Sequence, residues 1–244
     1  DDPGREGGTV VYNPYARLSL SQQRMQLPIF QSRRQLLYMV ERYRAVVVVG
    51  HTGCGKTTLA RALGRMVEVP AGQLSIDGQD ITALSLDDLR SKISLVPQEG
   101  YLFTATLAEN LRFGRPDATD SEMQQAARQA QLEGDVQAFP NGYETLVGER
   151  GITLSGGQRQ RTALGRALLV SAPVLVLDDA LASVDNNTAA AILDSIRSQD
   201  QRTIVMISHQ LSAAAACDRI LVMDQGLIVQ QGHHRELINR PGVY

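Results

Sequence analysis

The sequence predicts an α/β domain organised around a parallel β-sheet, and three apolar runs carry that prediction. Ala45–Val49 is a β-branched run with no polar–apolar alternation, and Val174–Leu177 and Thr203–Ile207 are further strand-sized apolar runs. A strand covered on both faces has this character, which favours a parallel sheet. Helix-like segments separate the runs, and strands that alternate with helices indicate an α/β domain.

Capping and turn signals predict the other elements. Ser32 and Gln35 form a capping box for a helix that ends near Tyr43, so the region before the first run is expected to be partly helical. Asp77-Gly78 after Gln73–Ile76 predicts a hairpin. The remaining expectations are a helix-like segment at Leu59–Met66, a strand at Ile93–Val96, helices within 119–139, a helix at Ala163–Leu169, and a closing hairpin of Arg219–Met223 with Leu227–Val229.

The order of these elements predicts how the chain is divided. Residues 1–17 contain prolines and several glycines and are expected to form a flexible lead-in, followed by one domain at 18–244. We expect a core at about 44–98 and 160–244. Residues 119–139 are rich in Ala, Gln and Leu, and they predict a helical subdomain at about 99–159.

Composition narrows the function classes. The 244 residues are 43% hydrophobic and 20% charged, and the formal net charge of −2 makes nucleic acid an unexpected partner. The two cysteines, Cys54 and Cys217, suit a reduced cytosolic setting better than a disulfide framework. No apolar stretch approaches the roughly 18–20 residues of a membrane span. Any membrane role is therefore expected from the cytosolic side, through a partner.

A phosphate-binding loop follows the first apolar run. Gly50 to Thr57 matches G-x-x-x-x-G-K-[ST], with a strand before it and a helix-like segment after it, a context that a chance glycine turn does not explain. Glycines let successive N–H groups point at an anion, Lys56 can reach the β- and γ-phosphates, and Thr57 can ligate Mg²⁺. The expected nucleotide-binding residues here are Gly50, His51, Thr52, Gly53, Cys54, Gly55, Lys56, Thr57 and Thr58.

Two further motifs, at Asp178 and at Ser155–Gln158, also suit the binding of phosphate and Mg²⁺. Asp178 ends the run Val174–Leu177, which places a carboxylate at a strand tip where it would hold Mg²⁺. Ser155, Gly156, Gly157 and Gln158 precede a helix-like segment and form a second expected anion-binding turn. One chain thus carries two phosphate-binding turns, whereas one nucleotide needs only one.

The run Leu154-Ser155-Gly156-Gly157-Gln158 resembles the signature motif of ABC ATPases. The resemblance covers about residues 65–244 and implies a P-loop NTPase fold with a RecA-like core, ATP and Mg²⁺ as ligands, and a head-to-tail dimer in which the signature turn covers the partner's ATP. By the same resemblance, Gln98 and His209 are catalytic residues: Gln98 contacts Mg²⁺ and His209 contacts the γ-phosphate. The segment 145–151 resembles that of exporters, which implies transmembrane partner domains at the cytoplasmic face of the cell membrane.

The residue after Asp178 departs from the family pattern. ABC ATPases normally carry a glutamate there, which polarises the attacking water, whereas this chain has Asp179. Because the aspartate is one methylene shorter and positioning dominates phosphoryl transfer, we expect this site to bind ATP but to hydrolyse it slowly. This favours a heterodimer with a competent partner over a homodimer. The alternative is that Asp179 is an adequate base.

The region before the loop departs as well. Residues 13–58 resemble the start of DEAH-box RNA helicases, through Gln23–Phe30 and the loop itself, so the chain is interpreted as a possible chimera. The residue that stacks on adenine is then uncertain, with Tyr12, Tyr15 and Phe30 as candidates. The helicase resemblance gives one alternative function, a helicase-like nucleic-acid-dependent ATPase. A second alternative is a module that dimerises on ATP without hydrolysing it.

Overall fold

The computed structural model describes residues 44–148, 151, 153–199, 202–209, 214–242 and 244. The expected lead-in at 1–17, the expected helix from Ser32 to Tyr43 and the candidate adenine-stacking residues lie outside these ranges.

A six-stranded sheet forms the centre and confirms the predicted α/β class. Its order is β10-β9-β1-β8-β7-β4, with every neighbouring pair parallel except the antiparallel pair of β9 and β10. The strands are β1 (Ala45–Gly50), β4 (Ile93–Val96), β7 (Val174–Asp178), β8 (Thr203–Ile207), β9 (Arg219–Asp224) and β10 (Leu227–Gly232). Each predicted strand is therefore present, and β10 is longer than Leu227–Val229.

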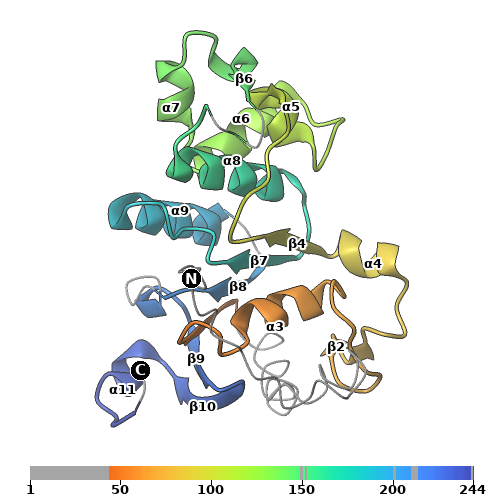
Figure 1. Cartoon of the computed structure of the whole chain (residues 1–244), viewed down its shortest axis with the longest axis vertical. Coiled ribbons are helices and arrows are strands. Elements are labelled where there is room, and N and C mark those ends of the chain that lie inside the picture. Colours follow the sequence, from red (N-terminus) through yellow and green to blue (C-terminus); the bar gives the residue numbers. More distant parts are fainter. Residues whose placement is uncertain (1–43, 149–150, 152, 200–201, 210–213, 243) are drawn as a thin grey trace, which may run out of the picture.

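Helices cover both faces of this sheet, which explains why β1 is apolar without alternation. Val47 and Val49 pack into one hydrophobic cluster with α8 (Gly156–Leu169) and α9 (Asn186–Gln199). Val46 and Val48 pack into a second cluster with α3 (Lys56–Leu63) on the other face. In Figure 1, α8 and α9 lie above the central strands and α3 lies below them. The two helix layers are thus separated by the sheet.

A third hydrophobic cluster lies in the helical part of the chain, at the top of Figure 1. It joins α5 (Leu107–Arg112), α6 (Asp120–Gln129) and α7 (Glu133–Ala138) with a 3₁₀ turn at Gly142–Glu144 and the short pair β5 (Ala105–Thr106) and β6 (Leu146–Val147). Complete capping boxes begin α5 at Thr106 and α6 at Thr119. Two helices, α6 and α7, lie within 119–139 as predicted, and α5 and α6 both pack on α8.

The predicted hairpin is present but short. β2 (Ser75–Ile76) pairs with β3 (Gln79–Asp80), and Asp77 and Gly78 both have positive φ, at 50° and 74°, as a type I′ turn requires. Four helices were not singled out from the sequence: α4 (Leu86–Ser91), α5, α9 and α11 (His234–Leu237). α4, α5 and α11 are too short for an apolar period, and α9 is recognisable chiefly by the face that it buries in the core.

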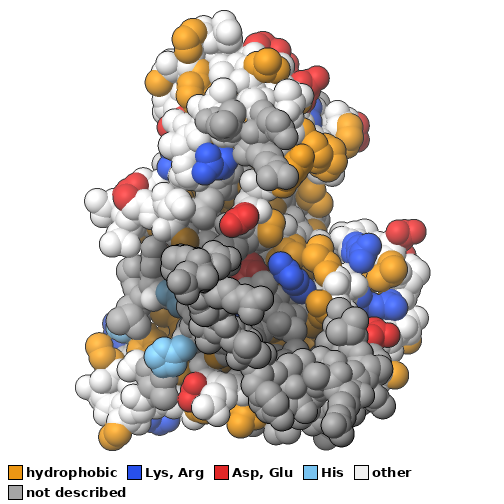
Figure 2. Space-filling model, in the orientation of Figure 1, with side chains coloured by type: hydrophobic (Ala, Val, Ile, Leu, Met, Phe, Trp, Pro, Cys, Tyr) orange, Lys and Arg blue, Asp and Glu red, His pale blue; other side chains and the backbone are white. Residues whose placement is uncertain are grey.

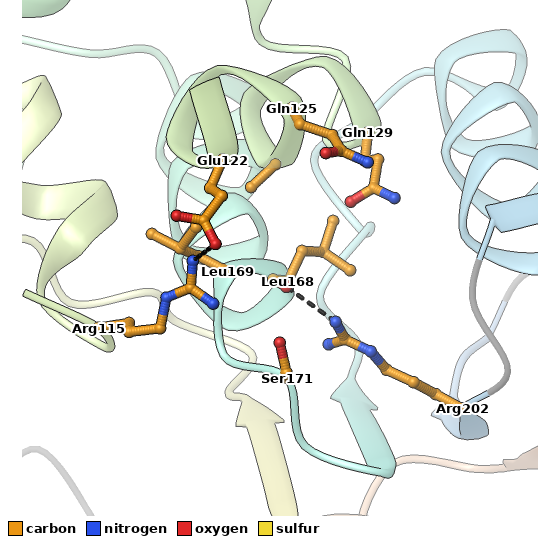
Figure 3. Close-up of a pocket in the computed structure, with 9 residues that line it drawn as sticks. Arg115, Glu122, Gln125, Gln129, Leu168, Leu169, Ser171 and Arg202 are labelled. Carbon is orange, nitrogen blue, oxygen red and sulfur yellow. Dashed lines mark hydrogen bonds and ion pairs between the residues drawn. The ribbon is translucent and has the colours of Figure 1, made fainter. Parts of the chain in front are cut away.

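Arg202 fixes the end of α8 where it meets the sheet. Its guanidinium donates to the carbonyl oxygens of Leu168 at 2.9 Å and Val170 at 2.8 Å, groups that the helix itself leaves without a partner. Figure 3 shows Arg202 reaching toward this helix end from across a cavity of about 190 Å³, with Arg115 paired to Glu122 on the other side.

We expect Arg202→Ala to lower the free energy of unfolding by about 1–3 kcal/mol, because it removes two hydrogen bonds to helix-end carbonyls. Urea denaturation of the purified chain measures this. Arg197→Ala is the matched control, because Arg197 forms an exposed pair with Asp218 that is expected to contribute about 0–1 kcal/mol. Equal losses in the two variants would contradict a role of Arg202 in holding α8.

Candidate functional site

The phosphate-binding loop joins β1 to α3, and its backbone requires glycine. Gly50 has a φ of 156°, and a Cβ placed there would lie 2.2 Å from the carbonyl oxygen of Met223 on the neighbouring strand. Gly55 has a φ of 102° and is the N-cap residue of α3, with no side-chain capping bond. The first turn of α3 carries no acidic residue, so the positive end of the helix is not neutralised from within. Such a turn suits an anion.

Lys56 is the cation of this loop. Its side chain is buried, and the ammonium donates to the carbonyl oxygens of Gly50 at 2.6 Å and His51 at 2.8 Å. The sulfur of Cys54 lies 3.7 Å away. The loop thus encloses a positive charge and holds it with its own backbone. This arrangement places the ammonium where phosphate oxygens would be bound by the surrounding N–H groups.

Thr57 and Asp178 meet at the carboxyl end of the sheet. The Thr57 hydroxyl donates to Asp178 Oδ1 at 3.2 Å, and Asp178 is buried. Burial raises the pKa of the Asp178 carboxyl, while the Thr57 hydrogen bond and the charges of Arg61 and Lys56 partly offset this rise. A hydroxyl and a buried carboxylate supply the hard oxygen ligands that suit Mg²⁺. The two residues singled out from separate motifs are therefore neighbours.

Asp179 and His209 lie at the ends of adjacent strands. Asp179 has a φ of 51° and its backbone N–H donates to the carbonyl oxygen of Ile207 at 2.9 Å, which ties the end of β7 to β8. Asp179 Oδ2 is 3.9 Å from Nε2 of His209, and the His209 ring is about half exposed. The structure thus brings Asp179 and His209, two of the three candidate catalytic residues, to one edge of the sheet, beside Asp178.

The turn Ser155–Gln158 begins α8. The Ser155 hydroxyl accepts from the Gln158 N–H at 3.2 Å, and the Gln158 side-chain oxygen accepts from the Ser155 N–H at 2.9 Å, which completes a capping box. The Gln158 amide also donates to Asp135 Oδ1 at 2.9 Å, and Asp135 forms a largely buried ion pair with Arg161. Asp135 was not foreseen, because no local pattern around it distinguishes it from other acidic residues of a helix.

Gln98 lies beside this second turn. It is exposed and lines a cleft of about 510 Å³ together with Gly156, Arg159, Gln160 and Ser183. Within the part of the chain that the structure describes, no hydrogen bond links Gln98 to Thr57 or Asp178. Its part in binding Mg²⁺ therefore stays a prediction.

The two anion-binding turns lie on opposite faces of the sheet. The loop before α3 belongs to the layer built on Val46 and Val48, whereas Ser155 begins α8 in the layer built on Val47. Figure 1 shows α3 and α8 with the strands β7 and β8 between them. The two turns therefore begin helices of different layers, which favours their binding two different nucleotides.

Comparison with known proteins gives a match to the family model described as "ABC transporter" over residues 34–182. The chain belongs to the ABC transporter family. It corresponds to the ATP-binding, ATP-hydrolysing domain of that family, with the P-loop NTPase fold expected from the sequence. The match begins before the phosphate-binding loop and includes it, so the helicase resemblance of residues 13–58 and the idea of a chimera gain no support.

The relatives of this ABC domain include bacterial and mitochondrial transporters. The chain is 42% identical over 212 residues to a probable multidrug resistance ABC transporter ATP-binding/permease protein, YheI, of Bacillus subtilis, covering 86% of the chain and 36% of that protein. It is 42% identical over 200 residues to the mitochondrial iron-sulfur clusters transporter atm1 of Aspergillus fumigatus, covering 81% and 28%. A solved bacterial Atm1-family ABC exporter with ATP bound matches with a TM-score of 0.79 and 40% identity, over 82% of the chain and 35% of that structure.

The chain spans roughly a quarter to a third of the length of these curated relatives. Among its described helices, none has both the length and the apolar character needed to cross a bilayer.

Proposed function

We propose that this ABC domain binds and hydrolyses ATP to power an exporter, as one half of a head-to-tail dimer with a second ABC domain. The observation that carries the proposal is the placement of the two anion-binding turns on opposite faces of one sheet. A second domain, turned head to tail, would set its own Ser155–Gln158 turn against the nucleotide held by the first domain's loop. Two such contacts would close a symmetric or pseudo-symmetric pair.

The residues around Lys56 would hold the nucleotide. Backbone N–H groups of the phosphate-binding loop and the Lys56 ammonium would bind the phosphates. Thr57 and Asp178 would hold Mg²⁺. Gln98, in the loop that follows β4 (the Gln98 loop), would be a further ligand when that loop approaches the metal ion. The metal ion supplies charge neutralisation at the transferred phosphoryl group. Asp179 would orient the attacking water and His209 would contact the γ-phosphate. These assignments rest on the shared strand-end position of Asp178, Asp179 and His209.

The membrane-spanning partner would dock beside the Gln98 loop. Tyr101 and Phe113 are about half exposed, and Phe103 stacks on Phe113 with ring centroids 4.2 Å apart. The guanidinium of Arg166 lies 5.5 Å from both phenylalanine rings. Figure 2 shows hydrophobic side chains gathered at the level of α5 and β4. An exposed aromatic surface suits a protein partner, and the exporter relatives favour transmembrane domains that hold this chain at the cytoplasmic face of the cell membrane.

The site of this chain is proposed to be the slower half of a heterodimer. Asp179 stands where the family carries glutamate, whereas the Ser155–Gln158 turn keeps the family sequence and would complete a competent site on the partner. A helical subdomain at about 99–159, with its own hydrophobic cluster, would carry that turn. A second candidate, also favoured by Asp179, is a module that dimerises on ATP without hydrolysing it.

Complementation between two variants tests the head-to-tail arrangement. Lys56→Met damages the loop and Ser155→Arg damages the other turn, so neither variant can form an intact composite site with itself. An equimolar mixture contains pairs with one intact site, and we expect Mg-ATP to drive dimerisation in the mixture but in neither variant alone. Size-exclusion chromatography with light scattering measures this.

Each outcome decides one point. Nucleotide-driven dimers of either variant alone would contradict the head-to-tail arrangement. Equal behaviour of the mixture and the single variants would contradict head-to-tail pairing between two copies of this chain. ATP turnover, measured with and without an added ABC domain that carries the usual glutamate, then separates a slow site from the non-hydrolysing module.

A further inference from the structure

Gln160 lies at the point where three functional segments meet. It sits on α8, two residues after the Ser155–Gln158 turn, and only 7% of it is exposed. Its side-chain oxygen accepts from the Ser183 N–H at 2.8 Å, and its side-chain nitrogen donates to the Gln98 carbonyl oxygen at 3.5 Å. One buried amide therefore bridges the loop that follows β4 and the loop that follows β7.

Both loops pack closely on the same part of α8 at positions where a glycine allows the close approach. A Cβ on Gly157 would lie 3.0 Å from the Ser183 carbonyl oxygen, so the first turn of α8 lies directly against the loop that follows β7. A Cβ on Gly100 would lie 2.6 Å from Cβ of Ala163, one turn further along α8. The start of α8 is thus enclosed by the two loops, and neither loop can move without disturbing it.

The loop that follows β7 and contains Ser183 (the Ser183 loop) begins at Asp179, a candidate catalytic residue. Asp179 accepts from the Ala182 N–H at 3.1 Å, and Val184 donates to Leu181 at 3.1 Å, so the segment from Asp179 to Val184 is a compact pair of turns. A shift of the backbone at Asp178 and Asp179 would therefore move Ser183 as part of a rigid unit. Ser183 is exposed, and its N–H reaches α8 through Gln160.

We propose that Gln160 is a positioning residue that couples the nucleotide site around Lys56 to the Ser155–Gln158 turn of the same chain. The inference rests on the proposed function, because the two coupled turns would serve the two different nucleotides of a dimer. The shorter hydrogen bond, which Gln160 accepts from the Ser183 N–H, carries the coupling. The longer hydrogen bond, which Gln160 donates to Gln98, links the loop that follows β4 to the same side chain. Removing the Gln160 amide leaves both anion-binding turns chemically intact but removes the hydrogen bonds that link them.

Amide hydrogen exchange, followed by NMR on the full chain without nucleotide, tests the first step. In Gln160→Leu the Ser183 N–H loses its acceptor, and we expect its exchange to become about tenfold faster or more. The Val184 N–H, which is bonded within its own turn, serves as an internal reference that stays within about threefold. Unchanged exchange at Ser183 would overturn the bridge.

The second step compares the response to Mg²⁺ with a non-hydrolysable ATP analogue. In the wild-type chain we expect the analogue, bound at the Lys56 loop, to change the exchange of the Gln158 N–H. In Gln160→Leu this response should fall to less than about a third, with analogue affinity within about threefold of wild type. Gln137→Leu, an exposed glutamine on α7, is the matched control and should respond as wild type does.

Gln160→Glu separates the bridge from a general loosening of α8. The carboxylate still accepts from the Ser183 N–H, so we expect both the protection of Ser183 and the Gln158 response to be restored. A wild-type response that persists in Gln160→Leu, or a Gln160→Glu variant as defective as Gln160→Leu, would overturn the coupling. A wild-type chain that does not bind the analogue would overturn the proposed ATP binding itself, and the coupling with it.

Discussion

Lys56→Met is expected to lower ATP turnover about 100-fold or more, the largest loss that any single substitution in this chain should cause. Removing one preorganised charged donor from a phosphoryl-transfer site costs about 10²–10³ in rate. Methionine is an unbranched side chain one heavy atom shorter than lysine, so it fills most of the space that Lys56 occupies inside the loop. The variant therefore loses the charge with little change in packing.

Nucleotide binding should fall together with turnover. A ligand present at about 100 times its Kd stabilises a folded protein by about 2.7 kcal/mol, so Mg-ATP should raise the melting temperature of the wild-type chain and have little effect on Lys56→Met. Lys92→Met is the matched control, because Lys92 is an exposed lysine at the end of α4. A thermal shift in Lys56→Met equal to that of wild type would contradict the assignment of the loop.

Asp179→Glu is expected to raise turnover about tenfold or more. The extra methylene advances the carboxylate by about 1.5 Å, and an error of about 1 Å in the position of a reacting group can cost 100-fold. The backbone N–H of Asp179 is bonded to Ile207, which limits how far the main chain can shift to make up the distance. The length of the side chain then decides where the carboxylate lies.

The measurement isolates the site built on this chain. Phosphate release is followed in a mixture with an ABC domain whose own glutamate has been replaced, so that only the site around Lys56 can turn over. Asp194→Glu, the same chemical change at an exposed position on α9, is the control. Asp179→Asn should be no faster than wild type. No gain in Asp179→Glu would show that Asp179 is already an adequate base and would remove the main argument for an asymmetric pair.

Local sequence patterns were sufficient to predict the strands of the sheet and the segments that meet at its edge. β1 was predictable because Ala45–Val49 is apolar on both faces, and the structure buries it between two helix layers. The neighbouring positions of Thr57 and Asp178 follow from motif order, because loops after parallel strands gather at one edge of a sheet. These features depend on short stretches of chain.

Contacts between distant segments were not predictable in the same way. Asp135 holds Gln158, and Gln160 holds Ser183, across 23 residues in each case. Such pairs depend on how α7, α8 and the loop after β7 pack together, and a single sequence carries no periodic signal for that. The helix α9 was missed because its buried face becomes evident only beside the sheet. Gln98 lies beside the start of α8, and its expected contact with Mg²⁺ stays a prediction.

The bonds that Lys56 makes within its own loop have a consequence for affinity. Because its ammonium is already held by two carbonyl oxygens, a phosphate group that binds there exchanges one set of partners for another. The net free energy of binding is then the difference between two strong sets of contacts. The charge of the ligand and its fit to the loop decide whether that difference is favourable. Small anions that bring charge without a chain of phosphates should therefore compete poorly with a nucleotide, so this loop can select for the length of its ligand.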